Sequence, residues 1–412
     1  MPTGPHQGGK KMKRPRALAS RLAALCAFAA LLALPPGIRA DPPGIRAEVD
    51  SFNVISWASP VGSQSLAFET LYGLKSWISF VNANGGIAGK TLEFQSVDMD
   101  DSAPDFIDML DALVIRGQPD VVVGGAANTR PHQTAEYFRR IALPWFGPWT
   151  IDPRLYADRD DDPIGLIPSA PAEMDMLFDY IKKTQRPGQS VHFFYSDGLE
   201  NSQAVSSLAR AKARSFGLEV NLVALPPDFN AWRSLKDKIS DYSFIILWTN
   251  PGPSAAIKRL LSPLLPNSLW LTNSLNSPDH EMMQMTAGAW TGVVFPSVLV
   301  PSEEIRDVYR TVLRKYSLPG LNPDYQSFLG FGEGQLLARA LAAATAASPK
   351  PLSGDIYSAF KKIDLEGTIL SGNKPPSGAD DPGGAYLAIV MPKGEWMSLE
   401  KAIQNLSGKN LQ

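Results

Sequence analysis

Short apolar runs alternate with segments of helical periodicity from Glu48 onward, and this alternation constrains the fold more than any other feature of the sequence. The runs are VISW, DVVVGG, LPWFG, SVHFFY, LEVNLVA, SFIILW, LWLT and TGVVF. Strands that are apolar along their length are typical of parallel sheets covered by helices on both faces. The pattern therefore predicts an α/β fold, and a chain of 412 residues predicts two lobes of about 150 residues each.

Polar and aromatic residues lie at the ends of these runs, where open parallel sheets bind ligands. They are mostly hydroxyls, amides and tryptophans, which suits a small ligand held by neutral hydrogen bonds and aromatic walls. Each Ser, Thr or Asn could equally cap the following helix, and Trp248 could equally be a core residue. The candidate ligand-binding residues are Ser59, Ala126, Ala127, Asn128, Thr129, Trp149, Thr150, Tyr195, Asp197, Trp248, Asn250 and Asn273.

The N-terminal region is typical of a secretory signal peptide. Basic residues from Lys10 to Arg16 precede an apolar run, Leu22 to Leu34, which is followed by two prolines and the small residue Ala40. A membrane anchor is the alternative, but the run is short of the roughly 20 residues that cross a bilayer. We expect cleavage of residues 1–40, a linker over 41–47, and a mature chain without disulfides, since Cys26 is the single cysteine.

The stretch NGGIAGKT, residues 84–91, resembles a phosphate-binding loop with Asn84 in place of the first glycine. A phosphate loop follows a strand and opens a helix. Here Leu71, Leu74 and Ile78 precede the loop at helical spacing, and TLEFQSV after it alternates as a strand does. The order is reversed, so Gly85 and Gly86 are predicted to end a helix rather than to hold a nucleotide.

No set of residues predicts catalysis, a metal ion or another cofactor. His132, His192 and His280 each lack a second ligand at metal-binding spacing, and His192 is predicted to be a hydrogen-bonded core residue. The Ser358–Lys361 pair lacks the partner motifs of penicillin-binding enzymes. The acidic clusters at 98–101 and 158–162 lack calcium-loop spacing and are interpreted as solvated loops. A net charge of -2 predicts no nucleic-acid partner.

Five segments follow one another in a set order: WISFVNANGGIAGKTLEFQSVDMDD, GQPDVVVGGAANTRPHQTAEYFRRIALPWFGPWT, SVHFFYSDGLENSQAVSSLARAKARSFGLEV, YQSFLGFGEGQLLARALAAA and GAYLAIVMPKGEW. In the order of these motifs, the chain resembles the periplasmic solute-binding proteins of the branched-chain amino acid type, and the first segment carries the most specific likeness. The resemblance covers residues 48–412. It implies two Rossmann-like lobes joined by three crossovers, with lobe 1 at 48–168 and 298–378 and lobe 2 at 169–297 and 379–412.

The resemblance also implies a periplasmic monomer that closes over a small molecule and docks on an ABC permease, without enzymatic activity. Residues 126–129 and the turn Trp149–Thr150 match segments that hold a ligand carboxylate in amino acid binders. The sequence departs from the family at Leu199, Glu200 and Asn201, where relatives have an aromatic turn. It offers only Asn273, Ser274 and Asn276 where amino acid binders have an acid, which counts against an α-amino acid ligand. The expected solute is a small organic molecule that is amino acid-like, an amide or a carboxylate. A sensor that reports to a signalling partner is the alternative function.

Overall fold

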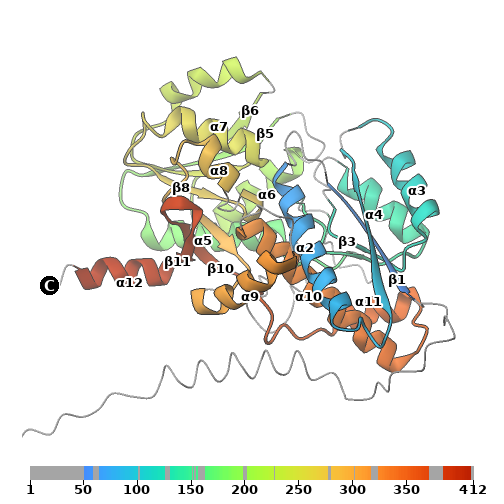
Figure 1. The fold of residues 1–412 in the computed structure, drawn as a ribbon. Helices are drawn as coiled ribbons and strands as arrows, with labels where there is room; N and C mark the ends of the chain where they lie inside the picture. Colours follow the sequence, from blue (N-terminus) through green and yellow to red (C-terminus); the bar gives the residue numbers. More distant parts are fainter. Residues whose placement is uncertain are drawn as a thin grey trace, which may run out of the picture. The chain divides into compact units, whose positions relative to one another are not determined.

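The strands lie in two sheets, as the alternating pattern predicts (Figure 1). The computed structural model describes residues 51–58, 65–100, 103–125, 130–150, 152, 155, 163–197, 202–226, 228–276, 280–300, 302–316, 323–370 and 384–409. We call the sheet ordered β2-β1-β3-β4, with the helices packed on it, lobe 1. Lobe 2 is the sheet ordered β11-β10-β9-β8-β7-β5-β6 with its helices. Paired neighbours are parallel except where β10 meets β9 and β11. The α/β prediction is confirmed.

The strands of lobe 1 are β1 (Ser51–Ala58), β2 (Thr91–Asp98), β3 (Val121–Val123) and β4 (Trp145–Phe146). Those of lobe 2 are β5 (Ser190–Ser196), β6 (Asn221–Leu225), β7 (Ser243–Trp248), β8 (Leu269–Thr272), β9 (Val294–Ser297), β10 (Tyr386–Val390) and β11 (Trp396–Ser398). The carboxyl ends of the parallel strands of each sheet therefore form one edge.

The helices of lobe 1 are α2 (Ser65–Ala83), α3 (Phe106–Gly117), α4 (Pro131–Arg140), α9 (Glu303–Tyr316), α10 (Tyr325–Ala347) and α11 (Ser353–Lys361). Those of lobe 2 are α5 (Ala170–Thr184), α6 (Ser202–Ser215), α7 (Pro251–Leu261), α8 (His280–Met285) and α12 (Leu399–Lys409), with the 3-10 turns η2 (Phe229–Lys238), η3 (Ser274–Asn276) and η4 (Pro392–Gly394). Helix α10 packs on α2 and α11, and α9 packs on α2.

Successive side chains of β1 point to opposite faces of the lobe 1 sheet, and both faces are covered. Ile55 and Trp57 belong to one buried cluster with residues of α3 and α4. The neighbouring Val54 is equally buried, and α2 also packs on β1. The β1 strand pairs in parallel with β2 over its full length, from Ser51 opposite Thr91 to Ala58 opposite Asp98. A strand covered on both faces must be apolar throughout, which explains the VISW run.

Helices α2 and α10 lie side by side, closer than side chains normally permit (Figure 1). A Cβ atom built on Gly330 would lie 1.8 Å from the carbonyl oxygen of Thr70, and one on Gly73 would lie 1.9 Å from that of Ser327. Gly334, also on α10, lies against the Trp77 side chain of α2. Glycine is thus required on both helices because backbone meets backbone.

Several local predictions are confirmed. Helix α2 ends at Ala83, and Gly85 and Gly86 follow with φ values of 96° and 73°, so the glycine stretch terminates a helix. His192 is buried, and its Nε2 lies 2.9 Å from the Ser190 hydroxyl. The segment GAYLAIVMPKGEW, which carries part of the family resemblance, contains β10 and the start of β11, and these two strands pair in antiparallel fashion.

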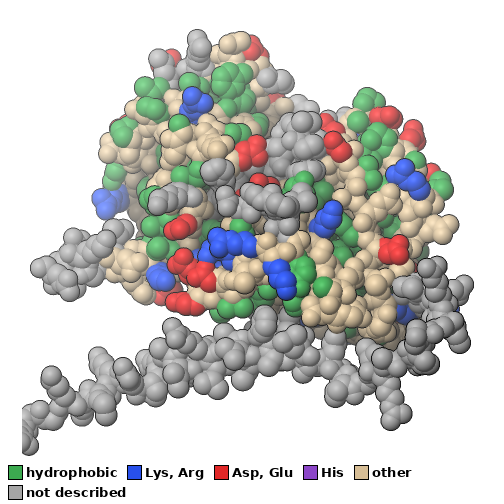
Figure 2. All heavy atoms as spheres, viewed as in Figure 1, with side chains coloured by type: hydrophobic (Ala, Val, Ile, Leu, Met, Phe, Trp, Pro, Cys, Tyr) green, Lys and Arg blue, Asp and Glu red, His purple; other side chains and the backbone are tan. Residues whose placement is uncertain are grey.

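The surface shown in Figure 2 carries acidic and basic side chains interspersed with apolar and neutral ones. Within the described part of the chain, no helix is both long and apolar enough to cross a bilayer.

We predict that Gly330→Ala destabilises the protein strongly, by about 2 kcal/mol or more, because the new methyl group must push two helix backbones apart. The free energy of unfolding, measured in urea, tests this. The matched control is Gly252→Ala in the first turn of α7, where a Cβ would meet nothing within 4 Å. Equal stabilities of the two variants would contradict the close contact.

Candidate ligand-binding site at the carboxyl ends of the strands

The predicted binding residues fall into two groups at the carboxyl edges of the two sheets. Ser59 and the loop Ala126–Thr129 lie outside the described residues, so their placement stays a prediction. The described candidates are Trp149 and Thr150 in lobe 1, and Tyr195, Asp197, Trp248, Asn250 and Asn273 in lobe 2.

In lobe 1, two glycines place the chain directly on two tryptophan rings. After β3, Gly124 and Gly125 adopt positive φ values of 65° and 88°. A Cβ on Gly124 would lie 2.6 Å from the Trp149 ring, and one on Gly125 would lie 2.6 Å from Trp57. The backbone N–H of Trp149 also donates to Gly125 O at 3.1 Å. Gly124 and Gly125, which precede residues 126–129 in the chain, therefore lie directly against the two indole rings.

Trp149 is buried and hydrogen-bonded within the protein. Its Nε1 donates to Oε1 of Glu333 at 2.5 Å, and Glu333 is fully buried on α10. Burial raises the pKa of Glu333 well above its usual range, which the Trp149 hydrogen bond only partly offsets. Sequence reasoning missed Glu333, although an acid within the apolar stretch FLGFGEGQLLARA was a detectable signal.

Thr150 is also buried, and its side chain hydrogen-bonds to the backbone of its own turn. The Oγ1 atom accepts a hydrogen bond from the Asp152 N–H at 3.1 Å. This contact fits the alternative in which such a hydroxyl stabilises local backbone.

In lobe 2, the end of β7 presents buried polar atoms that have no partner among the described residues. Trp248 is 1% exposed and stacks on Phe193 with ring centroids 5.8 Å apart, yet its Nε1 donates to no acceptor. Asn250 precedes α7 but makes no side-chain capping bond, and its Oδ1 is buried without a partner. The stacking supports core packing of the Trp248 ring, while Asn250 does not perform the capping role.

The neighbouring end of β8 is a network of amides and hydroxyls. The Asn273 side chain donates to Thr249 O at 3.3 Å and accepts from the Asn276 N–H at 3.2 Å. The Asn276 amide donates to the same carbonyl at 2.8 Å and to the Ser254 hydroxyl at 2.9 Å. The Oδ1 of Asn276 has no partner among the described residues. This network fixes the turn η3 at the carboxyl edge of the sheet.

A carboxyl group contacts this turn. The sequence predicts only Asn273, Ser274 and Asn276 here, without an acid. Glu173, in the first turn of α5, is 2% exposed. Its Oε2 accepts from the Ser274 N–H at 3.1 Å, and its Oε1 closely contacts the Ser274 hydroxyl. Burial raises the pKa of Glu173 to about 8, against the lowering effect of the two Ser274 bonds. The acid was missed because α5 is distant in sequence from β8.

At the end of β5, Tyr195 is half-buried and Asp197 is exposed. The Asp197 N–H donates to Leu225 O at 2.9 Å, which continues the pairing of β5 with β6. Among the described residues, no three His, Cys, Asp or Glu side chains gather closely enough to hold a metal ion.

Comparison with models of known protein families identifies the family of this chain. A family described as periplasmic binding protein matches residues 59–370, so the chain belongs to the periplasmic binding protein family. Its fold is the two-lobed type I fold of that family. A comparison with curated proteins found no match.

Solved structures of several binding proteins share the fold. A substrate-binding periplasmic protein from Ralstonia solanacearum is 18% identical with a TM-score of 0.70, over 84% of this chain and 100% of that one. A branched-chain amino acid ABC transporter protein from Thermus thermophilus with bound valine is 14% identical with a TM-score of 0.67, over 85% and 95%. A solute-binding protein of an ABC transporter from R. palustris in complex with benzoate is 15% identical with a TM-score of 0.66, over 85% and 95%.

We predict that Glu173 makes stability fall as the pH rises. The folded protein keeps the Glu173 proton up to pH of about 8, whereas the unfolded chain releases it near its ordinary pKa of about 4.3. Between these values the folded state binds more protons, so raising the pH costs up to about 1.4 kcal/mol per unit.

Urea unfolding of the wild type and of Glu173→Gln at pH 5 and pH 7.5 measures this effect. The variant should gain stability relative to the wild type at the higher pH. The exposed Glu219→Gln is the control for the loss of one carboxylate from the chain. A difference between wild type and Glu173→Gln that stays constant with pH would refute the assignment.

Proposed function

We propose that the chain is the solute-binding protein of an ABC importer, which captures a small organic solute between its two lobes and delivers it to a permease. The solute is uncharged or carries a carboxylate. The protein has no catalytic role, and residues 1–40 direct it to the periplasm as a cleaved signal peptide.

The buried atoms without partners at the lobe 2 edge carry this proposal. They are one donor, Trp248 Nε1, and two acceptors, Asn250 Oδ1 and Asn276 Oδ1. A buried polar group without a partner costs about 1 to 3 kcal/mol, so these atoms gain most from a molecule that supplies both a donor and an acceptor. Their position at the carboxyl ends of β7 and β8 is where ligands bind in open α/β sheets.

The charge at this edge favours a neutral or acidic solute over an ammonium group. Glu173 is the carboxyl nearest to Ser274, and with a pKa of about 8 it is mostly protonated at neutral pH. A buried ammonium needs a charged partner, which a protonated carboxyl does not supply. The valine-bound and benzoate-bound structures show that the fold itself accommodates both kinds of molecule.

On the lobe 1 side we propose that Asn128 and Thr129 grip the solute. Their loop begins at Gly124 and Gly125, which lie on the rings of Trp149 and Trp57.

A thermal-shift screen of the mature protein with amino acids, amides, aromatic acids and short carboxylates tests the solute class. A solute present at about 100 times its dissociation constant should add about 2.7 kcal/mol of stability. Tight binding of leucine or valine would contradict the charge argument.

We predict that Thr129→Val weakens binding of the solute identified in this way by about 1 to 3 kcal/mol, because the shape is kept and the hydroxyl is lost. Titration followed by tryptophan fluorescence measures the change. Thr311→Val, on the exposed surface of α9, is the matched control and should bind as the wild type does. Unchanged binding by Thr129→Val would place the lobe 1 contacts elsewhere.

A further inference from the structure

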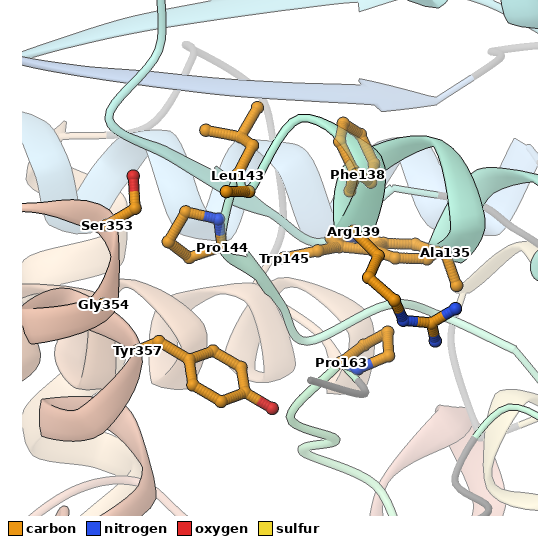
Figure 3. Close-up of a pocket in the computed structure, with 11 residues that line it drawn as sticks. Ala135, Phe138, Arg139, Leu143, Pro144, Trp145, Pro163, Ser353, Gly354 and Tyr357 are labelled. Atoms are coloured by element: carbon orange, nitrogen blue, oxygen red, sulfur yellow. The ribbon is translucent and has the colours of Figure 1, made fainter. Parts of the chain in front are cut away.

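A second cavity lies in lobe 1, where the sheet ends at β4 (Figure 3). Its volume is about 350 Å³, within the size range of small-molecule pockets. The lining residues are Ala135, Phe138, Arg139, Ala142, Leu143, Pro144, Trp145, Pro163, Ser353, Gly354 and Tyr357.

The cavity follows from the way two helices flank an edge strand. β4 is the last strand of its sheet and pairs with β3 through Trp145 and Phe146 alone. Trp145 packs on Phe138 of α4, with ring centroids 5.3 Å apart. Phe146 stacks on Phe360 of α11 at 4.0 Å. Because successive strand residues face opposite sides, α4 and α11 cover opposite faces and leave a space between them at the edge.

This cavity is separate from the candidate site at the carboxyl ends of the strands. It is lined by Leu143, Pro144 and Trp145, at the amino end of β4. Trp149 and the 126–129 loop follow the carboxyl ends of β4 and β3. A ligand in the cavity therefore contacts a different edge of the sheet.

The chemistry of the lining is mostly apolar with one cation. Phe138, Leu143 and Trp145 are among the apolar lining residues, and none of the lining residues is acidic. Arg139 and Tyr357 extend toward the same space from α4 and α11, with Pro163 near both (Figure 3). A guanidinium has five N–H donors, so Arg139 can hold a ligand oxygen in addition to any bond within the chain.

We propose that this cavity is a second binding site, for a small carboxylate with an aromatic or aliphatic body. The body fills the space against Trp145, Phe138 and Leu143. The carboxylate bonds to the Arg139 guanidinium and the Tyr357 hydroxyl at the open side. Charge-assisted bonds of this type are about twice as strong as neutral ones.

Isothermal titration of the mature protein with phenylacetate, hexanoate and phenylacetamide tests the proposal. We expect both carboxylates to bind, and phenylacetamide to bind roughly tenfold more weakly because it lacks the charge. Equal affinity for phenylacetamide, or no binding of either carboxylate at millimolar concentration, would overturn the proposal.

Gly354→Leu provides the sharpest variant, because a Cβ on Gly354 meets nothing within 4 Å and the longer side chain occupies the cavity. Phenylacetate affinity should fall at least roughly tenfold, as it should in Arg139→Gln, which removes the cation. Gly252→Leu is the control, since Gly252 also has open space, in the first turn of α7.

Thr129→Val separates this site from the one between the lobes. Phenylacetate bound in the cavity should be insensitive to Thr129→Val and sensitive to Gly354→Leu. The reverse pattern would assign phenylacetate to the strand ends and refute the second site.

Discussion

The backbone contact between α2 and α10 is the constraint on which much of lobe 1 depends. Gly73 and Gly330 bring the helices together at a distance that no side chain permits. Once seated, α10 carries Glu333 beneath Trp149, and the Trp149 ring in turn supports Gly124 at the start of the 126–129 loop. A packing requirement between two helices is thus linked, through Glu333 and Trp149, to the position of Gly124 at the carboxyl end of β3.

Each sheet has a buried glutamate close to its carboxyl edge, and both glutamates are mainly affected by burial. Glu333 is held by an indole N–H and Glu173 by a serine hydroxyl and backbone N–H. Within the described residues neither carboxyl group is hydrogen-bonded to a cation, and burial raises both pKa values. Both acids act as hydrogen-bonding groups at these edges, and Glu173, with a pKa of about 8, adds little negative charge at neutral pH.

Much of the fold was predictable from sequence, because buried parallel strands and amphipathic helices leave strong local patterns. The helix before Gly85, the strand TLEFQSV and the core position of His192 were predicted correctly from such patterns. The site was harder to predict because its contacts join distant segments. Glu173 meets Ser274 across 101 positions and Trp149 meets Glu333 across 184. The residues around Ser274 do not indicate that a carboxyl group of α5 hydrogen-bonds to it. Likewise, local sequence cannot distinguish a tryptophan that contacts a ligand from one that packs against backbone.

The side chain of Gln326 joins the two lobes, and this has a consequence for how the protein can evolve. The Thr70 hydroxyl donates to Gln326 Oε1 at 3.0 Å, and Gln326 Nε2 donates to Leu275 O at 3.3 Å, all in buried surroundings. Thr70 and Gln326 belong to lobe 1, whereas Leu275 lies in η3 of lobe 2. In the proposed closure of the two lobes, this bridge contributes to the free-energy difference between open and closed forms wherever closure changes its geometry. Since apparent affinity scales with the population of the binding-competent form, substitutions at the bridge can retune affinity while leaving solute selectivity unchanged.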